Sequence, residues 1–197
     1  MRRNMLMSVA RVSLLWLTPV LAGVVGCSSH MRNFTHADAD MSFYQKVGVI
    51  PFRSMTADAF AGEKFTAAFT TALLAARIFE VSDPGVFATA LKQVAGARIP
   101  EDSLTPEQLK KIGEAGGVQG VFIGSISQYE MTATTAWNFP VIAVDVRFID
   151  VATGTVVWKA SASERGGPKT PIIGLGEVRT LGELADRMSR KMIASMK

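Results

Sequence analysis

The stretch Gly113–Ser163 decides the fold, and it reads GEAGGVQGVFIGSISQYEMTATTAWNFPVIAVDVRFIDVATGTVVWKASAS. Its pattern predicts three consecutive strands. The middle strand alternates apolar residues with Asp145 and Arg147, which is typical of a strand with one buried and one solvated face. Asp150–Gly154 then fits a hairpin turn, in which Gly154 can take a positive φ. The sequence therefore predicts an antiparallel three-strand meander.

The segments on either side of this meander have patterns that predict further strands and helices. Lys46–Phe52 is a continuous apolar run that predicts a strand covered on both faces. Helices are expected over about 58–77, after Asp83-Pro84, from Thr105 and from Thr180, and a short strand over 78–81. We expect one α/β domain of the α+β type over residues 46–197: a mixed sheet with a C-terminal three-strand antiparallel meander, packed by helices.

The N-terminus has the pattern of a processing segment. Arg2, Arg3 and Arg11 provide positive charge, and the apolar run 12–25 is shorter than the ~20 residues of a membrane-spanning helix. Small residues then precede Cys27, the only cysteine of the chain. This pattern resembles the lipobox of bacterial lipoproteins and implies a signal peptide over 1–26 and lipidation (palmitate or a similar acyl chain) at Cys27. The alternative is an ordinary secretory signal with a chance cysteine.

Residues 27–45 are predicted to be the lipidated N-terminus and a flexible tether that lets the domain stand off the membrane. His30 and His36 are the only histidines, and no cysteine or acidic residue has ligand spacing with them. We therefore expect no metal site. Ser28 follows the cysteine where an Asp would resemble an inner-membrane retention signal, so the predicted location is the outer membrane, facing the periplasm.

Composition excludes several classes of protein. A single cysteine excludes internal disulfides and cysteine-rich zinc sites. Removal of residues 1–26 takes away three arginines and no acidic residue, which leaves 18 basic against 17 acidic side chains. The basic character of the precursor thus lies mostly in its signal, and we expect no binding to nucleic acid.

The sequence shows no catalytic constellation. A nucleophilic Ser or Cys needs a neighbouring base, but Cys27 is the predicted lipid anchor and both histidines lie in the predicted tether. The glycines over 113–124 precede a strand, and no Gly-Lys-Ser/Thr follows them, so they do not form a phosphate-binding loop. We therefore predict that the chain is not an enzyme and binds no cofactor.

Two apolar features are candidates for partner contacts. The expected helix carries no charge from Phe65 to Ala76, so it is either clamped inside the domain or meets another subunit, and Phe65 and Phe69 are its candidate contacts. The tip over 132–140 carries Trp137 and Phe139, which lie on one side of an extended chain. These rings either bind a partner or fold back onto the core.

Three motifs resemble a family of periplasmic domains. They are Val49–Phe52, Gly117–Ile126 and Asp150–Trp158, which read VIPF, GVQGVFIGSI and DVATGTVVW. The family includes the curli-secretion lipoprotein (CsgG-like), the lipoprotein activator of penicillin-binding proteins (LpoB-like) and the N-terminal domain of the Tol–Pal translocation protein. The resemblance implies an α/β domain that binds envelope proteins. Curli-type members carry longer membrane hairpins than Ser127–Pro140 would allow.

These observations lead to three hypotheses. The first is an outer-membrane lipoprotein that acts as an accessory module of an envelope machine, through contact with a penicillin-binding protein or a secretion component. The second is a homo-oligomeric component of a curli-like secretion assembly. The third, an envelope hydrolase, is disfavoured by the missing nucleophile–base pair.

Overall fold

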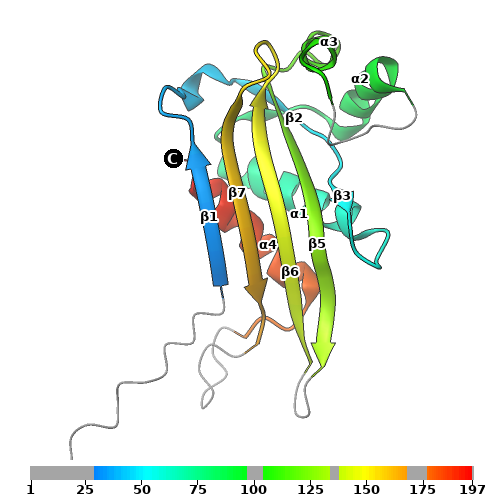
Figure 1. Cartoon of the computed structure of the whole chain (residues 1–197), viewed down its shortest axis with the longest axis vertical. Helices are drawn as coiled ribbons and strands as arrows, with labels where there is room; N and C mark the ends of the chain where they lie inside the picture. Colours follow the sequence, from blue (N-terminus) through cyan, green and yellow to red (C-terminus); the bar gives the residue numbers. More distant parts are fainter. Residues whose placement is uncertain (1–28, 97–103, 134–137, 168–176, 197) are drawn as a thin grey trace, which may run out of the picture.

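A computed structural model describes residues 29–96, 104–133, 138–167 and 177–196 of the chain. These residues form one mixed sheet with helices on both of its faces (Figure 1). The strand order is β1-β7-β6-β5-β2-β4, with β3 paired to β5. The expected α/β class, with a single mixed sheet, is confirmed. The elements are β1 Ser29–Thr35, β2 Lys46–Val49, β3 Arg53–Ser54, α1 Ala61–Ala76, β4 Glu80–Val81, α2 Pro84–Ala95, α3 Pro106–Gly116, β5 Gly120–Ala133, β6 Asn138–Asp150, β7 Val156–Arg165 and α4 Leu181–Ala194, with a short 3₁₀ turn at Met41–Phe43.

The predicted meander is present as β5, β6 and β7. Both neighbouring pairs are antiparallel, and the β5–β6 pairing continues out to Ala133 and Asn138. Gly154 takes a φ of 72° in the turn between β6 and β7, as expected. The β5–β6 hairpin is the longest feature of the sheet and extends beyond the end of β7 (Figure 1).

The predicted flexible tether over 27–45 is wrong for much of its length. Ser29–Thr35 forms β1, which pairs with β7 in an antiparallel register from Ser29 opposite Glu164 to Thr35 opposite Trp158. All side chains from His30 to Thr35 are exposed. The strand is therefore held mainly by backbone hydrogen bonds, which do not produce an apolar pattern in the sequence.

The expected first strand is shorter than predicted. β2 ends at Val49, and Pro51, which has no N–H to donate, separates it from β3. The next amide, that of Phe52, donates to the hydroxyl of Thr66 on α1 at 2.8 Å. β2 runs parallel to both β5 and β4, which makes the sheet mixed.

Local sequence signals explain where the helices begin. Thr105 and Thr180 each form a capping box with the residue three positions later, and Asp83 accepts from the amides of Gly85 and Val86. α1 lacks a side-chain cap, but its first turn approaches the sheet closely. A Cβ on Gly62 would lie 1.9 Å from the carbonyl oxygen of Phe52, so only glycine fits there.

The sheet separates two buried clusters. One lies under α1 and α4 and contains a series of aromatic rings that includes Phe69, Phe122, Phe148 and Trp158. The other lies under α2 and α3 and contains aliphatic residues around Phe87. Successive residues of β5 serve opposite clusters: Val121 packs with the second and Phe122 with the first.

Candidate interaction surfaces

The aromatic residues predicted on α1 do not reach the surface. Phe65 and Phe69 are both fully buried and pack against the ring of Phe52. Their prediction as partner contacts is therefore wrong. The helical spacing that made them conspicuous points them into the core.

Phe139 also folds back onto the domain, as the alternative interpretation of the tip expected. Its side chain is buried, and the guanidinium of Arg165 lies 3.5 Å from the centre of its ring. The prediction that Phe139 contacts a partner is therefore wrong. Trp137 and Cys27, the other predicted site residues, lie outside the described residues.

The outer face of α1 does remain open to solvent. Ala67 and Thr71 are exposed, and Leu74 exposes 56% of its surface. Because the sequence carries no charge between Phe65 and Ala76, this exposed face is uncharged. An uncharged exposed helix face of this kind is a candidate interaction surface.

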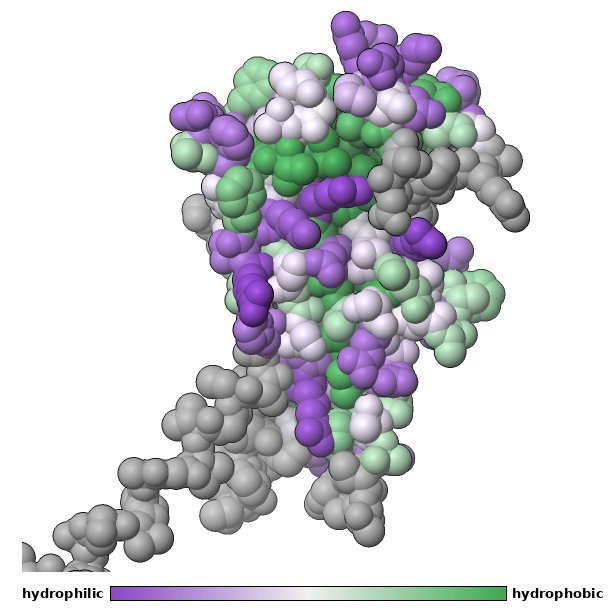
Figure 2. All heavy atoms as spheres, in the orientation of Figure 1, coloured by the Kyte–Doolittle hydropathy of each residue, from purple (hydrophilic) through white to green (hydrophobic). Residues whose placement is uncertain are grey.

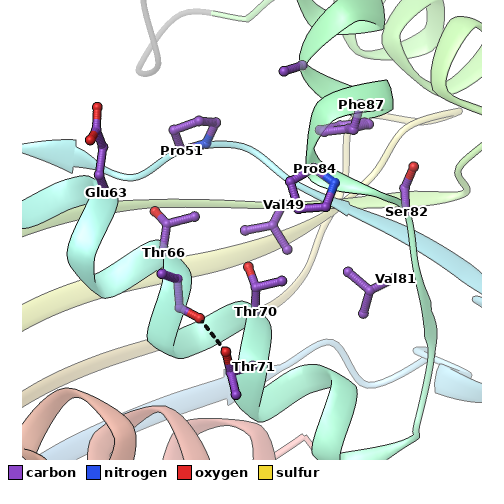
Figure 3. Close-up of a pocket in the computed structure, with 12 residues that line it drawn as sticks. Val49, Pro51, Glu63, Thr66, Thr70, Thr71, Val81, Ser82, Pro84 and Phe87 are labelled. Atoms are coloured by element: carbon purple, nitrogen blue, oxygen red, sulfur yellow. Dashed lines mark hydrogen bonds between the residues drawn. The ribbon is translucent and has the colours of Figure 1, made fainter. Parts of the chain in front are cut away.

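This face forms one wall of a groove of about 310 Å³ that α1 shares with β2, β4 and α2 (Figure 3). Val49 and Val81 come from the sheet, and Pro84 and Phe87 come from the start of α2. On the α1 side, small residues line the groove: Thr66, Ala67, Thr70 and Thr71. Glu63 is the single charged residue that lines the groove.

Two of the threonine hydroxyls that line the groove, those of Thr66 and Thr71, form hydrogen bonds within the chain. Thr71 donates to the carbonyl oxygen of Ala67 at 2.9 Å (Figure 3), and Thr66 donates to that of Gly62 at 2.7 Å. Thr66 also accepts from the amide of Phe52. The groove therefore suits apolar side chains better than a polar ligand, which would need free donors and acceptors.

The opposite face of the sheet is polar where α2 and α3 do not cover it. Figure 2 shows this face, with hydrophilic side chains over its middle and an apolar band near the covered end. A shallow hollow of about 260 Å³ there is lined by Ser125, Asp145, Arg147 and Lys159, among others. Asp145 accepts a short hydrogen bond from Ser161, which fits the predicted solvated charge pattern on a strand face.

Two buried polar clusters connect different parts of the chain through hydrogen bonds and ion pairs. Asp150, 8% exposed, accepts from the amides of Ala152 and Thr153 and, at 3.1 Å, from the hydroxyl of Tyr44. Burial, followed by the charge of Asp150, raises the pKa of Tyr44 to about 12.

The second cluster joins β7 to α4. Glu164 is buried and lies 2.7 Å from the Arg187 guanidinium and 2.8 Å from the Lys191 ammonium. Each charge of this cluster has a partner within the domain, so the cluster serves packing rather than an outside ligand.

The described residues hold no group of three His, Cys, Asp or Glu side chains with metal-binding geometry. Among the same residues, no helix is long and apolar enough to cross a membrane.

Sequence reasoning missed the groove because its lining comes from separate segments. Val49, Val81 and Pro84 are unremarkable in their own contexts, and only the pairing of β2 with β4 brings them beside α1. The uncharged run over 65–76 was the one signal in the sequence, and it lies on the helix that forms one wall of the groove.

Comparison with known proteins gives matches at the level of structure. No family model matches the chain, and no curated protein matches it. The PelC dodecamer from Paraburkholderia phytofirmans superposes with a TM-score of 0.58 and 18% identity, covering 85% of this chain and 96% of that chain. Lipoprotein GNA1162 from Neisseria meningitidis superposes with a TM-score of 0.55 and 21% identity, covering 77% of this chain and 99% of that one.

Another solved structure superposes less well. The NMR structure of LpoB from Escherichia coli has a TM-score of 0.45 and 16% identity, over 83% of this chain and 88% of that chain. The resemblance to the periplasmic family stays a prediction. The chain thus shares its fold with PelC and with the GNA1162 lipoprotein.

Proposed function

We propose that this chain is an outer-membrane lipoprotein, facing the periplasm, that acts as a non-catalytic accessory module of an envelope machine. The observation that carries the proposal is the uncharged, exposed face of α1 beside an apolar groove. The shared fold with GNA1162, whose name describes it as a lipoprotein, supports the predicted anchor at Cys27.

The groove has the features of a protein-binding site. It is concave and mostly apolar, the hydroxyls of Thr66 and Thr71 are hydrogen-bonded within the chain, and its one charged lining residue, Glu63, can make a polar rim contact. A partner would insert one or two apolar side chains between α1 and α2. A penicillin-binding protein or a secretion component is the class of partner that the predicted family resemblance implies.

Self-assembly is the second candidate, and a specific observation favours it. PelC, which has this fold, is described as a dodecamer. In a head-to-tail assembly the α1 face of one copy would meet a different surface of the next, and such contacts close into a ring when the rotation between copies allows it.

A charge placed on the α1 face tests both candidates. Ala67→Glu and Thr71→Glu put a carboxylate on the exposed side of α1, and Ala115→Glu on the exposed side of α3 is the matched control. The mass of the detergent-purified protein is measured by light scattering, and its partners are captured with a photo-crosslinker at Thr71 in the native envelope.

If the copies assemble through this face, the α1 variants become monomeric at an unchanged melting temperature, and the control does not. If an envelope protein binds there, wild type is monomeric and the crosslink is lost in the α1 variants alone. Variants that unfold, or that keep both the mass and the crosslinks of wild type, would contradict the proposal.

The anchor has its own test. Cys27→Ala should leave the protein unprocessed or released from the membrane, because no other cysteine can receive the lipid. Metabolic labelling with a fatty acid measures directly whether the variant still carries an acyl chain. A mutant that still takes up the label would show that the acyl chain is attached elsewhere.

A further inference from the structure

The distance between the predicted anchor and the folded domain is very short. β1 begins at Ser29, so only Ser28 separates its first residue from Cys27. The two residue steps from Ser29 to Cys27 span at most ~7 Å even when fully extended. A lipid on Cys27 would therefore hold the start of β1 close to the membrane surface.

The pairing of the strands identifies which part of the sheet shares this end. Ser29 lies opposite Glu164 on β7, which lies opposite Ile142 on β6, which lies opposite Tyr129 on β5. The β5–β6 hairpin continues past this row and points to the same side as the start of β1 (Figure 1). From Tyr129 to Ala133 the hairpin extends by ~14 Å, at about 3.4 Å per residue.

The hairpin end therefore reaches at least as far toward the membrane as Cys27 can. If the strands stand upright on the bilayer, the residues beyond the Tyr129–Ile142 row meet the lipid headgroups. The headgroup layer is ~5–7 Å thick on each side of the hydrocarbon core, so the end of the hairpin can enter it.

The chemistry of this end suits a lipid surface. No residue from Met131 to Pro140 is charged, and Met131 exposes 46% of its surface. Arg165 stacks on Phe139 at the base of this segment and is itself exposed, so its guanidinium can reach headgroup phosphates. The opposite end of the sheet lies beside α3, which carries Glu107, Lys110, Lys111 and Glu114.

We propose that the uncharged end of the β5–β6 hairpin, through its exposed residues Met131, Ala133 and Asn138, lies against the membrane leaflet that holds the Cys27 lipid. The inference rests on the anchor of the proposed function. It directs α2 and α3, at the other end of the sheet, away from the bilayer (Figure 1).

The test uses full-length lipidated protein in vesicles of phosphatidylethanolamine with a smaller share of phosphatidylglycerol. Because the lipid occupies the sulfur of the only natural cysteine, Ala133→Cys gives a single free thiol for an environment-sensitive fluorophore. Ala152→Cys is the matched control: an exposed alanine in the β6–β7 turn, at the opposite end of the sheet. Quenching is measured with spin-labelled lipids, and flotation reports the anchor separately.

The label at position 133 should be quenched at least about threefold more than the label at 152, and Met131→Glu should reduce that quenching, because a charge resists entry into the interface. Floating protein with equal quenching at the two positions, or quenching insensitive to Met131→Glu, overturns the hairpin contact and leaves the anchor intact. Protein that does not float overturns both.

Discussion

Asp150 shows how one carboxylate can order a turn and a distant segment together. It accepts from two amides of its own turn, from the Thr153 hydroxyl and from Tyr44, which lies 106 residues earlier in the chain. The sequence predicted the turn from Gly154, but the Tyr44 contact is long-range and has no local signal. Local hydrogen-bonding chemistry is readable from sequence, whereas its distant partners are not.

The Tyr44 contact predicts a pH dependence. The folded chain holds the phenol neutral to a pKa of about 12, whereas in the unfolded chain it ionises near 10. Between these values the unfolded chain loses the proton first, so the free energy of unfolding falls as pH rises from 10 toward 12. Below pH 10 this contribution is fully present.

Tyr44→Phe should therefore lower the free energy of unfolding by about 1 kcal/mol at pH 7, because it removes the hydrogen bond to Asp150. Above pH 10 the variant's free energy of unfolding should fall less steeply with pH than that of wild type. Urea unfolding at pH 7 and at pH 10.5 measures both. Tyr129, whose pKa is also raised by burial, remains in the variant and sets the residual slope. If the free energy of unfolding of Tyr44→Phe fell with pH as steeply as that of wild type, a group other than Tyr44 would cause the pH dependence.

The Glu164 cluster predicts unequal effects of its two cations. The Arg187 side chain is 17% exposed, whereas that of Lys191 is 45% exposed. Arg187→Met should cost about 2 kcal/mol, because it removes the better buried partner of a buried carboxylate, and Lys191→Met should cost less than about 1 kcal/mol. Thermal melts of the matched pair give the comparison. Equal losses would mean that the two cations are interchangeable.

At the scale of elements, the helices and the meander were predictable and β1 was not. Capping boxes at Thr105 and Thr180 and the Asp83-Pro84 start act within a few residues, so their sequence patterns carry the structure directly. β1 buries none of the side chains from His30 to Thr35, so no periodicity reveals it. Its formation depends on the free edge of β7.

This difference predicts fast local opening of β1. Because none of the strand's own side chains from His30 to Thr35 is buried, its amides should exchange with deuterium at least about a hundredfold faster than those of β6 in the middle of the sheet. Hydrogen exchange followed by mass spectrometry compares peptides from the two strands. Equal protection would show that β1 opens only with the whole domain.

At the scale of the whole molecule, the two buried clusters share the strand β5 and so should unfold together. Trp158 is fully buried in the α1–α4 cluster, and Ile112 is fully buried in the α2–α3 cluster on the other face. Ile112→Ala, made in a Trp137→Phe background so that Trp158 is the reporter in the processed chain, should destabilise by about 2–5 kcal/mol. It should shift the fluorescence transition as far as the circular-dichroism transition. A fluorescence transition that stays in place would show two independently stable faces.

The fold class followed from the sequence because the alternation in β6 and the helix starts are each local signals. The groove did not, because it depends on how β4 and α2 are placed beside α1. The uncharged run over 65–76 identified the helix, but the buried Phe65 and Phe69 were the conspicuous residues within it. The open face is made of small residues, which carry little signal by themselves.

The pairing of β1 with β7 also has a mechanical consequence. A pull between the Cys27 lipid and a partner at the far end of the sheet would act along the strand axis, whereas the β1–β7 hydrogen bonds run perpendicular to it. Such a load shears the paired row collectively instead of unzipping it bond by bond. A strand that opens readily in thermal fluctuation can thus bear tension, and the direction of the pull decides which behaviour is seen.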